Sequence, residues 1–65
     1  MKKYKVTVHF EDAYTKEYLM RTEETEDRAA AIRAFTIYIE HPDTTFCNVI
    51  IEDTDFIIAS YLREG

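Results

Sequence analysis

The sequence predicts an α+β fold in the order ββαββ, in which an antiparallel sheet carries one helix on one face. Residues 25–41 place apolar side chains at helical spacing, which indicates an amphipathic helix. The segments on either side alternate polar and apolar residues or are rich in β-branched and aromatic residues, which is typical of strands. Because the chain has only 65 residues, we expect a single domain spanning residues 1–65.

The first strand is expected over residues 3–11, because polar and apolar residues alternate there without a break. Residues 12–15 are mostly polar and start with aspartate, which predicts a turn. The second strand, residues 16–22, would then form an antiparallel hairpin with the first. Tyr4, Val6, Val8, Phe10, Tyr18 and Met20 are expected on the inner face, and Thr7, His9, Glu17, Leu19 and Arg21 on the outer face.

The helix is expected to begin after Thr25 or Asp27, either of which can cap its N-terminus. It should end at about Glu40, because Pro42 forces His41 out of the helical region. The stripe facing the sheet consists of Ala31, Ile32, Ala34, Phe35, Tyr38 and Ile39, with Ile37 on its flank. Four carboxylates precede this stripe, where the helix dipole favours negative charge: Glu23, Glu24, Glu26 and Asp27.

Two further strands are expected after the helix. Residues 45–52 are rich in β-branched and aromatic residues, and Cys47, as a small buried hydrophobe, should face the helix with Val49 and Ile51. Residues 56–62 fit either a fourth strand or a short C-terminal helix, and their Phe-Ile-Ile start favours the strand. The outer face would gain Phe46, Asn48 and Ile50, together with either Phe56, Ile58 and Leu62 or Ile57, Ala59 and Tyr61.

This outer face is apolar for a solvated sheet, and a monomer rarely exposes a contiguous apolar patch of more than a few hundred Å². The sequence therefore predicts that a partner covers it, unless strand twist buries the side chains locally. A second acidic group follows the third strand: Glu52, Asp53 and Asp55. The two acidic groups either imitate a nucleic-acid backbone for a basic cleft or serve as helix-dipole, turn and solubility charges.

Composition excludes several classes of function. A net charge of −5 and a pI near 4.8 argue against direct binding to nucleic acid or to an anionic membrane. The single cysteine allows no internal disulfide, and no Cys/His cluster predicts a metal or cofactor site. No nucleophile, phosphate loop or oxyanion site stands out, so we expect no enzymatic activity. No signal peptide or membrane span is evident, and a cytoplasmic location is expected, which is the host cell cytoplasm for a phage product.

The chain resembles short ββαβ inhibitors encoded by phages. The resemblance rests on Lys3-Tyr4-Lys5-Val6-Thr7-Val8, the acidic segment from Thr22 to Asp27, and Ala31-Ile32-Arg33-Ala34-Phe35, and it covers residues 3–52. The chain is similar to inhibitors of host RNA polymerase and to the dimeric, DNA-mimicking inhibitors of uracil-DNA glycosylase. It also resembles anti-CRISPR proteins in its small size and acidic character. Residues 46–52 lack the arginines of the polymerase inhibitors, and the glycosylase inhibitors have no fourth strand.

The resemblance implies an interaction module that blocks a host nucleic-acid-handling enzyme by occlusion or DNA mimicry. The alternative from the residues is a homodimeric structural or accessory domain whose outer face packs on a second copy. The expected partner-binding residues are Glu23, Glu24, Glu26, Asp27, Glu52, Asp53, Asp55, Leu19, Phe46 and Ile50.

Overall fold

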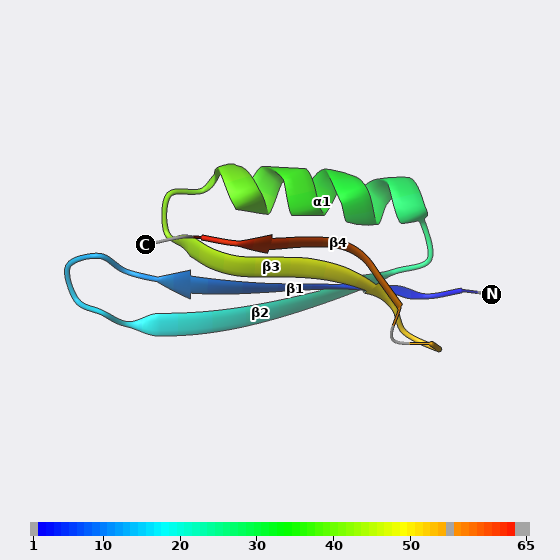
Figure 1. Ribbon diagram of the computed structural model, residues 1–65, viewed down its shortest axis with the longest axis horizontal. Helices are drawn as coiled ribbons and strands as arrows, with labels where there is room; N and C mark the ends of the chain where they lie inside the picture. Colours follow the sequence, from blue (N-terminus) through cyan, green and yellow to red (C-terminus); the bar gives the residue numbers. More distant parts are fainter. Residues whose placement is uncertain (1, 55, 64–65) are drawn as a thin grey trace.

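The five elements follow one another in the predicted order in a computed structural model that describes residues 2–54 and 56–63 (Figure 1). They are β1 (Tyr4–Glu11), β2 (Tyr18–Thr25), α1 (Arg28–Glu40), β3 (Thr44–Ile51) and β4 (Phe56–Leu62). The strands form one antiparallel sheet in the order β2-β1-β3-β4, and α1 packs on one face of it. The predicted ββαββ α+β fold is therefore confirmed, and the alternative of a C-terminal helix is wrong.

Side-chain hydrogen bonds support both ends of α1. At the N-terminus, the Asp27 carboxylate accepts a hydrogen bond of 2.9 Å from the amide of Ala29, as expected of an N-cap residue. At the C-terminus, His41 is extended, with φ −73° and ψ 130°, as expected before Pro42. The carbonyl of Tyr38 accepts the backbone amide of His41 at 3.1 Å and also the buried hydroxyl of Thr44 at 2.6 Å, so this helix-end acceptor has two donors.

The core lies between α1 and the two central strands. Its fully buried members are Val6, Val8, Ala31, Cys47 and Val49, and partly buried side chains packed against them are Tyr4, Phe10, Ala34, Phe35, Tyr38, Ile39, Ile58, Ala59 and Tyr61. Burial raises the pKa of the Cys47 thiol to about 11, so the side chain remains a neutral, inert thiol. Ile37 is 67% exposed, which agrees with its place on the flank of the predicted stripe.

The inner and outer faces of β2 are the reverse of the prediction. Leu19 pairs with Phe10 and Arg21 with Val8, while Met20 pairs with His9 and Tyr18 with Glu11. Directly paired residues share a face, so Leu19 and Arg21 lie on the helix side, whereas Tyr18 and Met20 lie on the open face. The physical reason is the loop of residues 12–17, which sets the register of the hairpin. Three consecutive apolar residues at the start of this edge strand fit either register.

The position of the first acidic group also differs from the prediction. Because β2 runs to Thr25, Glu23 and Glu24 belong to the strand and not to the helix N-terminus. The first turn of α1 carries no acidic residue, and Asp27 alone acts on the helix as its N-cap. Alternation along β2 places Glu23 on the helix side and Glu24 on the open face.

The fourth strand contains an irregularity that mixes the two predicted registers. Val49 pairs with Ala59 but Ile50 pairs with Ile57, so Ile58 is an extra residue in β4. The open face consequently receives Ile57, Ser60 and Leu62 from β4, while Ala59 and Tyr61 face the core.

The molecule as a whole is elongated, 42 × 17 × 17 Å, and the β1–β2 hairpin extends past the end of α1 (Figure 1).

Candidate functional site

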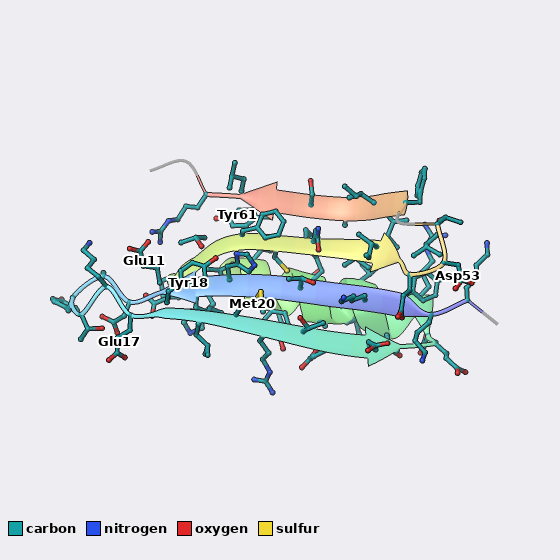
Figure 2. All side chains as sticks on the ribbon, turned by 90° about the horizontal axis from the view of Figure 1, so that it is seen from below. Glu11, Glu17, Tyr18, Met20, Asp53 and Tyr61 are labelled. Atoms are coloured by element: carbon teal, nitrogen blue, oxygen red, sulfur yellow. The ribbon has the colours of Figure 1, made fainter. Side chains whose placement is uncertain are left out.

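The open face is the side of the sheet that α1 does not cover (Figure 2). Cross-strand pairing arranges its side chains in three rows that each run across all four strands. An apolar and aromatic row consists of Met20, His9, Phe46 and Leu62; a polar row consists of Thr22, Thr7, Asn48 and Ser60; a mixed row consists of Glu24, Lys5, Ile50 and Ile57. The face is therefore apolar at one end, and its other end carries charges on β1 and β2 beside Ile50 and Ile57.

We call the apolar end the aromatic patch and define it as Tyr18, Met20, His9, Phe46 and Leu62. The His9 ring lies at its centre, with ring centroids 5.3 Å from Tyr18 and 5.1 Å from Phe46. The Tyr18 hydroxyl is hydrogen-bonded to Nδ1 of His9, which fixes both rings relative to each other. Tyr18 and Met20 are each 60% exposed and Leu62 is 73% exposed, so the patch is accessible to a partner.

The charged end of the open face mixes both signs. The ammonium group of Lys3 lies 3.8 Å from the Glu24 carboxylate. The backbone amide of Glu52 donates a hydrogen bond of 2.9 Å to the carbonyl of Lys3. A side-chain hydrogen bond with Glu24, then burial and the charge of Glu24, raise the pKa of the Glu52 carboxyl. Carboxylates from the two predicted acidic groups thus meet here, but lysines lie among them.

The remaining predicted acidic residues lie elsewhere. Glu23, on the helix side, accepts a hydrogen bond of 2.7 Å from the Tyr38 hydroxyl, and its other near contact is Arg21 at 3.8 Å. Glu26 is exposed between β2 and α1, and Asp53 is exposed in the turn after β3. Asp55 lies outside the described residues. The acidic residues therefore do not form a single row.

Of the predicted apolar contacts, Phe46 and Ile50 do lie on the open face, and Leu19 does not. Sequence reasoning missed Tyr18 and Met20, which were expected in the core, and it placed Leu62 on the open face in only one of its two registers for the fourth strand. The sequence of β2 gives little signal for the observed register, because Tyr18, Leu19 and Met20 are three apolar residues in succession.

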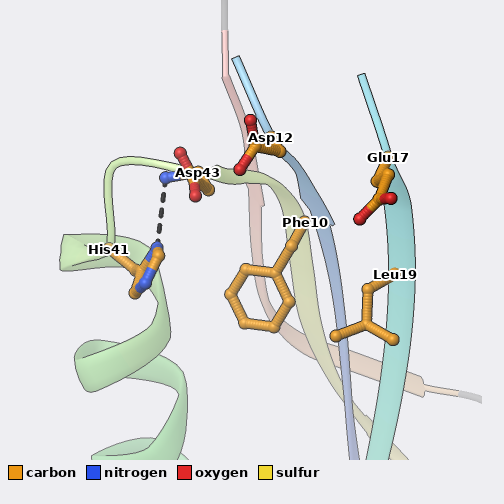
Figure 3. A pocket seen from close by; sticks show the side chains of 6 residues that line it. All are labelled: Phe10, Asp12, Glu17, Leu19, His41 and Asp43. Carbon is orange, nitrogen blue, oxygen red and sulfur yellow. Dashed lines mark hydrogen bonds between the residues drawn. The ribbon is translucent and has the colours of Figure 1, made fainter. Parts of the chain in front are cut away.

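Leu19 instead lines a shallow hollow of about 320 Å³ beside the helix C-terminus (Figure 3). Phe10 and Leu19 are its apolar lining residues, and the His41 ring lies beside Phe10, with ring centroids 5.3 Å apart. The other lining residues are Asp12, Glu17 and Asp43. The Asp12 carboxylate accepts the amides of Tyr14 and Thr15, at 2.8 and 3.0 Å, so it is used within the turn. The hollow follows from the way the hairpin extends past α1, and we assign no ligand to it.

Comparison with known proteins gives no relative: no family model, no curated protein and no solved structure matches the chain. Among the described residues, no helix is long and apolar enough to cross a membrane. Within the same residues, no three histidine, cysteine, aspartate or glutamate side chains come together as a metal site.

Proposed function

We propose that this protein is a non-enzymatic interaction module that binds another protein through the aromatic patch and inhibits a nucleic-acid-handling enzyme by occlusion. The observation that carries the proposal is the patch itself, in which Tyr18, Met20 and Leu62 are each at least 60% exposed around the rings of His9 and Phe46. Tyrosine and methionine are enriched at protein interfaces, and contiguous exposed apolar side chains typically become buried there.

The net charge of −5 supports an enzyme with a basic cleft as the partner. Opposite charge accelerates the encounter between two proteins and suppresses wrong partners, even where the charged groups stay at the rim of the interface. Glu24 and Glu52 lie close to each other at the charged end of the open face and suit this role. Because Lys3 lies beside Glu24, occlusion is better supported than imitation of an unbroken phosphate backbone.

The experiment uses purified bacterial RNA polymerase and uracil-DNA glycosylase as probes, since these represent the two inhibitor types that the sequence resembles. A photo-crosslinking amino acid replaces Met20 in one sample and Ile37 in the other. Both side chains are exposed, at 60% and 67%, but Ile37 lies on α1, away from the open face. We expect crosslinks to one of the enzymes from position 20 and none from position 37.

Activity assays complete the test. Met20→Lys should weaken inhibition of the bound enzyme at least tenfold, a loss of about 1.4 kcal/mol in binding, whereas Ile37→Lys should leave it unchanged. Raising the salt concentration should slow association because charge steering is screened. Absence of binding and inhibition with both enzymes would contradict the inhibitor proposal. Equal inhibition by both lysine variants would place the interface away from the aromatic patch.

A further inference from the structure

The two edges of the sheet differ in chemistry. The strand order makes β2 and β4 the edge strands. Within β2, Arg21, Glu23 and Glu24 provide the charges that usually protect an edge from pairing with another strand. The sequence of β4, Phe-Ile-Ile-Ala-Ser-Tyr-Leu, contains neither a charge nor a proline over its seven residues. Phe56, Ile57 and Leu62 on this strand are all more than half exposed.

The backbone groups at the free edge of β4 can be identified from the pairing with β3. The amide of Arg63 donates to the carbonyl of Thr45 at 3.0 Å, so Arg63 directs its backbone groups toward β3. These directions alternate along an antiparallel strand, and Ser60 and Leu62 therefore direct their N–H and C=O groups away from the sheet. The extra residue at Ile58 precedes this regular stretch and does not interrupt it.

We propose that β4 pairs with β4 of a second copy of this chain, in antiparallel orientation about a two-fold axis, to form a continuous eight-stranded sheet. With the axis at Tyr61, Ser60 lies opposite Leu62 of the second copy, and each such pair exchanges both of its hydrogen bonds. With this axis Arg63 lies opposite Ala59 of the second copy and away from the second Arg63. An in-register parallel pairing would instead place the two Arg63 residues side by side, which their charge disfavours.

A second copy is the occupant that the edge fits best, because every molecule brings the same uncharged edge and both edges are satisfied in one contact. The two helices then lie on the same side of the extended sheet, and the two open faces join on the other. This inference does not depend on the proposed partner enzyme, because it uses the backbone edge of β4 and shares only Leu62 with the aromatic patch.

The test is sedimentation equilibrium of the full chain, with substitutions at Ser60 and a matched control at Thr22. These residues lie in the same polar row at opposite edges of the sheet, and both are exposed. Ser60→Lys and Thr22→Lys change the net charge equally. Ser60→Pro removes an amide that points away from β3, so it should leave the β3–β4 pairing intact.

The wild-type chain should sediment as a dimer, and both Ser60 variants should dissociate at least tenfold more readily, with Thr22→Lys unchanged. Hydrogen exchange of the Ser60 and Leu62 amides should slow as the wild-type concentration rises. Circular dichroism identifies any variant that fails to fold. If Ser60→Pro does not fold, the dissociation of the Ser60→Lys dimer alone tests the proposal. A wild-type monomer at roughly 1 mM, or a dimer that tolerates both Ser60 substitutions, overturns the proposal.

Discussion

The hydroxyl of Tyr38 on α1 donates a hydrogen bond of 2.7 Å to the carboxylate of Glu23 on β2, and so connects the helix to an edge strand that it hardly covers. Burial, followed by the hydrogen bond and charge of Glu23, raises the pKa of Tyr38 above its ordinary value of 10.0. The bond joins a phenol to a carboxylate, which is a charge-assisted pair in a partly buried place.

Breaking this bond should lower the free energy of unfolding. We expect Tyr38→Phe and Glu23→Gln each to cost about 1 kcal/mol, and the double variant to cost less than their sum. Urea unfolding of all four proteins measures the coupling. Because the folded-state pKa of Tyr38 is raised, the wild-type advantage should be complete below pH 10.0 and decline as the pH rises further. Strictly additive costs would show that the two residues act independently.

The hairpin loop contains a backbone conformation that its residue does not favour. Lys16 has a φ of 61°, in the left-handed region where glycine is preferred. Lys16→Gly should therefore stabilise the fold by about 1 kcal/mol in thermal or urea unfolding. Lys16→Ala removes the same charge without relieving the conformation, so it should give no gain. A gain from both variants would point to the charge as the cause.

The end of α1 should depend on the hydroxyl of Thr44. This side chain is fully buried and donates to the carbonyl of Tyr38 at 2.6 Å. Thr44→Val keeps the shape but leaves that carbonyl with the amide of His41 as its remaining donor, which should cost about 1 kcal/mol. Thr36→Val is the matched control, because the Thr36 hydroxyl bonds the carbonyl of Ile32 at an exposed site. We expect a loss of well under 1 kcal/mol for the control.

The carboxyl groups of Glu24 and Glu52 should make stability depend on acid pH. The hydrogen bond with Glu24, with smaller contributions from burial and charge, raises the pKa of Glu52 above its ordinary value of 4.5. The stabilisation from this pair is therefore complete below pH 4.5 and lost as the pH rises through the folded-state pKa. Glu52→Gln should raise the thermal midpoint slightly at pH 7, and Glu26→Gln, which removes the same charge, should not. Equal thermal midpoints for wild type and Glu52→Gln at pH 7 would show that the ionised carboxylates of Glu24 and Glu52 do not repel each other measurably.

The sequence predicted the parts of the fold whose two faces differ sharply. In β1 the buried positions are Val6 and Val8 and the intervening ones are Lys5, Thr7 and His9, so only one register buries the apolar set. The sequence of β2 does not distinguish its two faces in this way, because Tyr18, Leu19 and Met20 are all apolar. Either register of this edge strand therefore exposes an apolar residue. The pairing of Met20 with His9 then depends on the loop of residues 12–17, including the left-handed Lys16.

The candidate site was harder to predict than the fold for a related reason. A cross-strand row such as Met20, His9, Phe46 and Leu62 combines four segments, so an error in one register removes a member. The acidic groups were read from their proximity in sequence, and strand alternation then sent Glu23 and Glu24 to opposite faces. Phe46 and Ile50 were placed correctly on the open face, opposite the buried Cys47 and Val49.

The slender shape of the molecule affects how its assembly can be measured. The radius of gyration is 12.1 Å, against about 11 Å for a typical globular chain of this length. A rod-like particle diffuses more slowly than a sphere of equal mass and leaves a sizing column early. A monomer would then elute at the volume expected of a heavier globular protein. Its molar mass should therefore be measured by light scattering or analytical ultracentrifugation and not inferred from the elution volume.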